Sequence, residues 1–248
     1  NNNFIIPVLI ASIIPIINFI LVFFYLPETK PNSTSNKLKT ILKNPLNQLF
    51  KVFKEEKIRK LSLAFFIYFI AFTGLTNILI FFLQESLGWT TKSSSGTLVV
   101  VGIIAIIVQG GLIGPLVKQF GEMRLTLIGS GFILVACSLL ITTPKENATI
   151  NIYSAVSFLA VGAGLITPTL RALISKKLDV DKQGSILSNL QGLQSLGGVL
   201  GIAMAGRVYD SFGPKSPFIA GSIILIFMIY LIAEGENKSF KDQKSKVF

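Results

Sequence analysis

The chain has 248 residues, of which 51% are apolar and 14% are charged, and its formal net charge is +11. An ordinary soluble domain carries roughly 25% charged residues, so this composition excludes a normally hydrated surface. Histidine is absent and Cys137 is the single cysteine, which excludes the usual zinc sites and Ser-His-Asp or Cys-His catalysis. We therefore expect no metal, no cofactor and no enzyme activity.

Seven apolar segments in chain order predict membrane-spanning helices. Each holds about 17 to 24 residues, which at 1.5 Å per residue matches a hydrocarbon core of roughly 30 Å. Helix is expected because unpaired backbone groups are costly in lipid, and the apolar-polar alternation of barrel strands is missing from the sequence. The predicted spans are 5–26, 61–83, 98–117, 125–142, 152–175, 186–206 and 217–233.

The basic residues lie in alternate connections between these spans. Of the 23 Lys and Arg residues, eighteen fall in the segments 27–60, 118–124, 176–182 and 235–248. By the positive-inside rule these segments are cytoplasmic, which places the N-terminus outside and the C-terminus inside. The positive charge is thus a topology signal, and we expect no nucleic-acid partner.

The segment 27–60 is predicted to be a basic cytoplasmic loop. Within it, Leu46, Leu49, Phe50 and Phe53 recur at helical spacing, which suits a helix in the headgroup layer. A solvated linker is the alternative. The segment 235–248 is predicted to be a basic cytoplasmic tail.

The long loop separates one span, residues 1–26, from a six-helix domain at 61–234. The six spans form two triplets, and the last span of each triplet contains no Asn, Gln or charged residue. Because polar groups in hydrocarbon must face a cavity or a partner, these two plain helices are expected at the lipid-facing periphery.

A short pattern recurs in the two triplets. Gly114 to Gly121 and Gly206 to Gly213 share Gly, a charged residue, Phe and Gly at the same spacing. Each follows the middle helix of its triplet, yet the charge distribution places them on opposite sides of the membrane. This arrangement predicts two inverted three-helix repeats, as in secondary transporters. Two ordinary glycine-bearing turns are the alternative.

These residues resemble the major facilitator superfamily, and within it the drug/proton antiporter branch of tetracycline and multidrug efflux proteins. Pro27-Glu28-Thr29 resembles the exit from helix six, and Gly114 to Arg124 resembles the signature loop between helices eight and nine. The segments 167–175 and 190–196 resemble the region of helices ten and eleven, and 209–213 resembles its outer turn.

The resemblance implies that the seven spans are helices six to twelve of a twelve-helix transporter in the plasma membrane, with the N-terminal half as the missing partner. It implies an all-α integral membrane bundle that moves a small-molecule solute by alternating access, with proton-coupled efflux of drug-like solutes as the expected activity. A metabolite or ion-coupled symporter, or a non-transporting scaffold derived from one, is the alternative. A seven-helix receptor shares the topology but not the one-plus-six spacing.

Polar residues inside the spans are the candidate lining of a substrate cavity: Thr73, Asn77, Gln109, Thr167, Arg171, Ser188, Gln191, Gln194 and Ser195. Ordinary hydrogen bonds between helices are the alternative for the amides and hydroxyls, as is snorkelling to the interface for Arg171. The candidate gating residues are Gly114, Lys118, Gly121, Arg124, Pro168, Gly206, Asp210 and Gly213.

Overall fold

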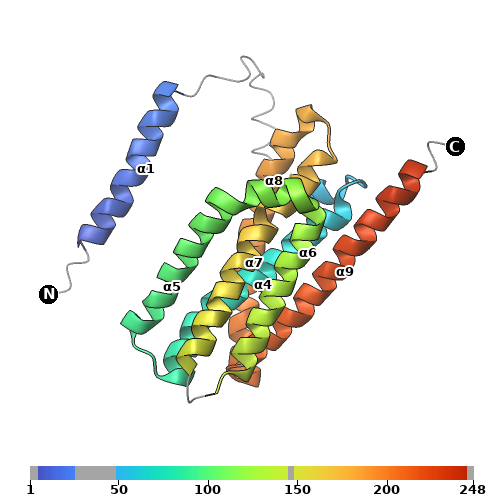
Figure 1. The fold of residues 1–248 in the computed structure, drawn as a ribbon. Helices are drawn as coiled ribbons and strands as arrows, with labels where there is room; N and C mark the ends of the chain where they lie inside the picture. The colour runs from blue at the N-terminus through green and yellow to red at the C-terminus, as the bar shows by residue number, and fades with distance from the viewer. Residues whose placement is uncertain (1–4, 26–48, 145–147, 245–248) are drawn as a thin grey trace. The chain divides into compact units, whose positions relative to one another are not determined.

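The computed structural model describes residues 5–25, 49–144 and 148–244, and helices dominate throughout these ranges without any strand. In chain order they are α1 (Ile5–Tyr25), η1 (Lys51–Phe53), α4 (Arg59–Phe81), η2 (Phe82–Ser86), α5 (Thr91–Ala105), η3 (Ile106–Leu112), α6 (Ile113–Thr142), α7 (Ala148–Lys176), α8 (Val180–Phe212) and α9 (Ser216–Lys244) (Figure 1). The predicted all-α membrane bundle is confirmed. Pro27-Glu28-Thr29 and most of the predicted loop lie outside the described residues.

The chain divides into two compact units, residues 1–45 and 46–248. The first contains α1, which stays helical through Pro15 although proline removes one backbone hydrogen bond. The second contains the other helices. The α9 helix continues to Lys244, beyond the end of the last predicted span at residue 233.

Four stretches among the described residues are long and apolar enough to cross a membrane: Arg59–Ser86, Thr91–Thr142, Ala148–Lys176 and Ser216–Glu234. The second has 52 residues, and a straight helix of that length would measure about 78 Å, far more than one crossing needs. Gly121 interrupts it with non-helical angles, φ 77° and ψ 159°. The chain folds back there, so the stretch holds the two predicted spans 98–117 and 125–142 (Figure 1).

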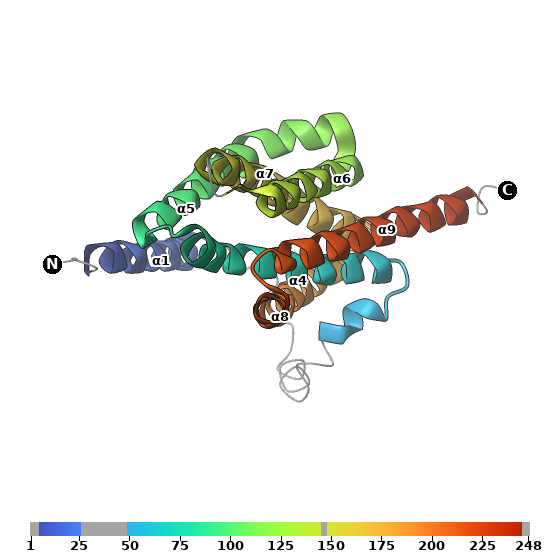
Figure 2. The same cartoon turned by 90° about the horizontal axis from the view of Figure 1, so that it is seen from below.

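The helices of one triplet pack mainly on helices of the other. The α4 helix packs on α8 and α9, while α7 packs on α5 and α6, and α6 also contacts α9 (Figure 2). Exchanging α4 with α7, α5 with α8 and α6 with α9 leaves this set of contacts unchanged. Gly121 and Gly213, the last glycines of the two recurring patterns, both have positive φ, 77° and 90°. These features are those expected of two inverted repeats.

Glycines allow the closest approaches between these helices. A Cβ on Gly201 of α8 would lie 2.2 Å from the carbonyl oxygen of Ile70 in α4, and a Cβ on Gly162 of α7 would lie 2.6 Å from the carbonyl oxygen of Gly129 in α6. Small residues at membrane helix interfaces let backbones pack this closely. The α4–α8 and α6–α7 pairs, one from each of the two kinds of contact that the exchange relates, therefore both rely on glycine.

Polar contacts tie helix ends together at both ends of the bundle. Lys60 pairs with Glu234, and Lys176 pairs with Glu122. At the opposite end the Tyr209 hydroxyl donates to Glu85 Oε2 at 2.8 Å. Each contact joins segments that the charge distribution places on the same side of the membrane.

The residues just before α4 pack onto the bundle. Val52 is buried, the rings of Phe53 and Phe66 meet edge to face with centroids 6.5 Å apart, and Leu49 lies against Gly192 of α8. The predicted helical character is present at residues 49–53. Val52 and Phe53 pack on the bundle while Phe50 is exposed, and the position of this segment in the headgroup layer stays a prediction. Leu46 lies outside the described residues.

Candidate functional site

A charged cluster joins the α7 and α8 helices. The Arg171 guanidinium of α7 donates through Nη2 to Gln191 Oε1 of α8 at 2.7 Å, and through the same nitrogen to Gln194 Oε1. We call Arg171, Gln191 and Gln194 the arginine cluster. Gln191 is exposed, whereas Arg171 and Gln194 are half-buried.

Helical spacing explains why these three side chains meet. Gln191 and Gln194 are three residues apart, so they lie on one face of α8 one turn from each other. Arg171 lies five residues before the end of α7 at Lys176, which corresponds to about 7.5 Å of helix rise. Its side chain bridges to the neighbouring helix at this depth.

Aromatic residues of α4 form the wall behind the cluster. The Arg171 guanidinium carbon lies 5.8 Å from the centre of the Phe65 ring, a distance typical of a cation–π contact. One turn further, the hydroxyls of Tyr68 and Thr167 are 3.4 Å apart, and the Tyr68 ring stacks on Phe72. Sequence reasoning missed Phe65 and Tyr68. Tyr68 could have been found from the sequence, because a tyrosine within an apolar run has a hydroxyl that needs a hydrogen-bond partner once it is buried.

The charge on Arg171 is incompletely compensated within the described residues. Its Nε is buried without a hydrogen-bond partner, and no carboxylate of the described residues pairs with it. Among the described residues, the guanidinium contacts two neutral amide oxygens and the face of one aromatic ring. On insertion scales an arginine at the centre of a membrane helix costs up to about 2.5–3.5 kcal/mol, and nearer the end, where Arg171 lies, it costs less. The incompletely compensated charge makes the cluster the strongest candidate for a functional site among the described residues.

A second feature is an apolar cavity of about 210 Å³ between α4, α5, η3 and α7. Gln109 lines it from η3, and Thr76 and Thr97 add hydroxyl groups. Gln109 lies at this cavity, and its role as a substrate contact stays a prediction. The η3 segment is a π-helix, a distortion often found at functional sites. The remaining lining residues are Phe72, Leu79, Ile80, Leu98, Val101, Ala105, Val156, Leu159, Ala160, Ala163 and Gly164.

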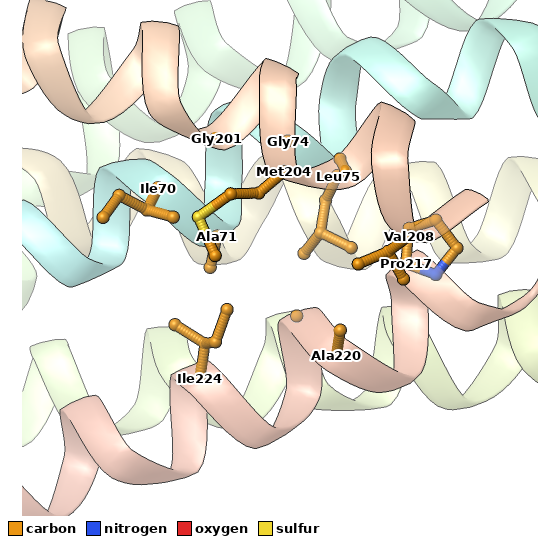
Figure 3. Close-up of a pocket in the computed structure, with 12 residues that line it drawn as sticks. Ile70, Ala71, Gly74, Leu75, Gly201, Met204, Val208, Pro217, Ala220 and Ile224 are labelled. Atoms are coloured by element: carbon orange, nitrogen blue, oxygen red, sulfur yellow. The ribbon is translucent and has the colours of Figure 1, made fainter. Parts of the chain in front are cut away.

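A third, smaller cavity of about 40 Å³ lies between α4, α8 and α9. Figure 3 shows its lining around Gly74 and Gly201, with Met204 and Leu75 on one side and Ile224 and Ala220 on the other. All its lining residues are apolar or glycine. This cavity is a packing gap beside the glycine contact and offers no group that would recognise a polar solute.

The side chains of Asn77, Ser188 and Ser195 take no part in the hydrogen bonds of the arginine cluster. Asn77 donates to the Thr73 carbonyl at 2.9 Å, Ser188 to the Gly184 carbonyl at 3.1 Å, and Ser195 to the Gln191 carbonyl at 3.2 Å. All three side chains are exposed and bonded to their own helices. Thr73 lies opposite Gly198 of α8, whose Cβ would be 3.7 Å from the Thr73 hydroxyl oxygen.

The predicted gating residues lie at the turns and along the helices between them. Gly114, Lys118 and Arg124 are exposed around the turn at Gly121, and Asp210 is exposed next to the turn at Gly213. Pro168 lies inside α7 without ending it. Gly206 has open space at its Cβ position.

An ion pair that the sequence did not predict closes the Gly121 turn against α7. Glu122 follows Gly121 in the connection between two predicted spans and pairs with Lys176. The hydrogen bond from Lys176 holds the pKa of the Glu122 carboxyl below its ordinary value, with burial opposing this effect. The pair therefore holds the turn against α7 at neutral pH.

Known proteins similar to this chain include tetracycline resistance proteins and hippocampus abundant transcript-like proteins. The tetracycline resistance protein, class H, of Pasteurella multocida is 28% identical over 133 residues, which cover 54% of this chain and 32% of that protein. Hippocampus abundant transcript-like protein 1 of Homo sapiens is 21% identical over 253 residues, which cover 91% of this chain and 49% of that protein. The chain thus spans between about a third and a half of the length of these relatives. The Major Facilitator Superfamily pattern matches residues 3–202, and with this match over most of its length the chain belongs to that superfamily.

Proposed function

We propose that this chain supplies helices six to twelve of a twelve-helix secondary transporter that works by alternating access. The fold, the family and the exchange of contacts between α4–α6 and α7–α9 support a transporter half. The chain covers 49% of the human relative, which supports a partner half outside this sequence. In this proposal residues 1–26 belong to the other half, 27–60 connect the halves, 61–234 form the six-helix domain and 235–248 form the tail.

The arginine cluster carries the proposal. A permanently charged side chain and two amides lie on facing surfaces of two helices in a membrane bundle, and Gln191 is exposed. Intramembrane charges usually face a bundle interior or an aqueous path, and in transporters they mark the substrate pathway. We place the path along this face, between the described helices and the other half.

Efflux of drug-like solutes is the proposed direction. Two relatives are named tetracycline resistance proteins, class H and class C, and the apolar cavity beside Gln109 suits an apolar solute body. No Asp or Glu lies in the middle of a described span. A proton carrier would therefore lie in the other half or at an edge, where Glu85 and Asp210 are the candidates.

The proposed orientation follows the basic connections. The end of the bundle with the Lys60–Glu234 and Lys176–Glu122 pairs faces the cytoplasm, and the end with Tyr209 and Glu85 faces outward across the plasma membrane. During the cycle the turns at Gly121 and Gly213 open and close the two sides. Pro168 lets α7 bend, since it removes a backbone donor beside the cluster.

Solute accumulation in cells tests the proposal. The complete coding sequence that contains this chain is expressed in cells lacking their main efflux pumps, and accumulation of tetracycline and ethidium is measured with and without a protonophore. Efflux predicts lower accumulation that the protonophore restores. Higher accumulation of a metabolite on expression would favour a symporter instead. A folded, membrane-inserted protein that moves none of a broad solute panel in either direction would refute transport and favour a scaffold.

A further inference from the structure

The arginine cluster presents hydrogen-bond donors almost exclusively. An arginine guanidinium has five N–H donors and no acceptor. Because Arg171 Nη2 donates to both glutamines, their carbonyl oxygens must face it, and their NH₂ groups must point away. No described residue accepts a hydrogen bond from either NH₂ group.

The guanidinium itself retains unused donor capacity. Its Nε is buried without a partner, although buried polar atoms are nearly always hydrogen-bonded in folded proteins. The Phe65 ring contacts the cation but accepts no conventional hydrogen bond. A bound group that accepts hydrogen bonds would therefore complete the site.

The missing acceptor should also carry negative charge. The described residues place no carboxylate against Arg171, and the two glutamines that contact it are the neutral analogues of glutamate. A planar guanidinium beside amide NH₂ groups matches the geometry of a carboxylate or phosphate group, which accepts two parallel hydrogen bonds.

We propose that the arginine cluster binds the oxyanion of the transported solute, so that the substrates are organic anions bearing a carboxylate or phosphate group. Gln191 and Gln194 orient the guanidinium and contribute their NH₂ groups to the same anion. The inference rests on the proposed transport function. The same chemistry would suit an anionic lipid headgroup, which the experiment distinguishes from a soluble solute.

Ligand-induced thermal stabilisation of the complete purified protein tests the site, because a ligand that binds only the folded state raises Tm. The soluble probes are benzoate, inorganic phosphate and, as the uncharged match for benzoate, benzamide. The lipid probe is a vesicle containing phosphatidylglycerol, compared with one of phosphatidylcholine alone. We expect benzoate or phosphate to raise Tm in uncharged detergent, and benzamide to leave it unchanged.

Substitutions separate anion binding from a purely structural role of Arg171. Arg171→Gln should weaken binding of the anion roughly tenfold to a hundredfold, the range for a hydrogen bond to a charged group. Arg59→Gln removes the same charge from an exposed position at the start of α4 and should leave anion affinity unchanged.

A charge-inserting variant gives the sharpest result and does not require removal of Arg171. Gln191→Glu places a carboxylate where the 2.7 Å hydrogen bond now lies, so it should raise Tm without ligand and abolish the response to benzoate and phosphate. Gln84→Glu adds the same charge at an exposed position in η2 and should do neither. If Arg171→Gln does not fold, this pair of variants still decides the question.

The outcomes separate the two proposals. Stabilisation by phosphatidylglycerol vesicles but by no soluble anion would assign the site to a lipid and overturn the substrate inference. Equal stabilisation by benzoate and benzamide, an unchanged anion response in Gln191→Glu, or no response to any anion would overturn it as well. Drug efflux that persists in Arg171→Gln would leave transport standing without an anion site, whereas anion binding without solute movement would refute transport alone.

Discussion

The contact between α4 and α8 at Gly201 gives a quantitative prediction. In Gly201→Ala the new Cβ would lie 2.2 Å from the Ile70 carbonyl oxygen and 3.1 Å from the Gly74 backbone nitrogen. Ordinary contact begins at 3.4 Å, so the two helices must separate by about 1 Å, and neither obstacle is a side chain that can rotate away.

The expected loss of stability is about 2 kcal/mol. Overpacking costs typically 1–3 kcal/mol, and we take about 3 kcal/mol because the obstacles are backbone atoms. Alanine is favoured over glycine in a helix by up to about 1 kcal/mol, which offsets part of the clash. The net change corresponds to roughly a 30-fold shift in the ratio of folded to unfolded protein.

The free energy of unfolding in mixed micelles measures this effect, with SDS as the denaturant and circular dichroism as the signal. Gly206→Ala is the matched control, because it lies in the same helix and its Cβ would meet nothing within 4 Å. It should be neutral or slightly stabilising. If Gly201→Ala unfolds at the same SDS concentration as Gly206→Ala, the close packing of α4 and α8 is wrong.

Two further substitutions test contacts at the two ends of the bundle. Since Lys176 lowers the pKa of Glu122 in the folded protein, the pair stabilises the fold above the ordinary pKa of this carboxyl, and the gain is lost as the pH falls through the lowered value. The Lys176 side chain is 67% exposed, so Glu122→Gln should lower the free energy of unfolding by under about 1 kcal/mol near pH 7. In acid the unfolding free energies of the variant and the unsubstituted protein should converge. A difference between them that persists in acid would contradict the ion pair. Tyr209→Phe removes the 2.8 Å hydrogen bond to Glu85 and should cost about 1 kcal/mol in the same SDS titration. Tyr230→Phe, at an exposed position of α9, should have no effect, and equal effects of the two would argue against this contact.

The helices and their order were predictable from local composition. Apolar runs long enough to cross a bilayer can satisfy their backbone groups only as helices, so the boundaries follow from where charges and turn residues interrupt them. Gly121 was also identifiable, because its pattern recurs at Gly213. The sequence did not indicate that Gly121 would be the one residue with non-helical angles at this turn. It also did not indicate the pairing of Glu122 with Lys176, because that contact depends on where α7 ends.

The candidate site was predictable in part. Arg171, Gln191 and Gln194 stood out as polar residues in apolar spans, and the structure brings them together. Asn77 stood out equally but bonds its own helix. The two cases differ because the partner of a side chain across a helix interface depends on how the helices are rotated and how they cross. The periodicity of a single segment does not contain that information.

The sequence by itself determined that this protein crosses a membrane as helices, which connections share a side and that two triplets repeat, because these properties depend on local hydropathy, charge and short patterns. Only the tertiary structure decided that Arg171 meets two amides and an aromatic ring but no described carboxylate. That arrangement joins residues up to 129 positions apart, from Phe65 on α4 to Gln194 on α8. The α4 and α8 helices, which carry Phe65 and Gln194, approach each other closely at Gly74 and Gly201, where the absence of side chains brings the helices into contact.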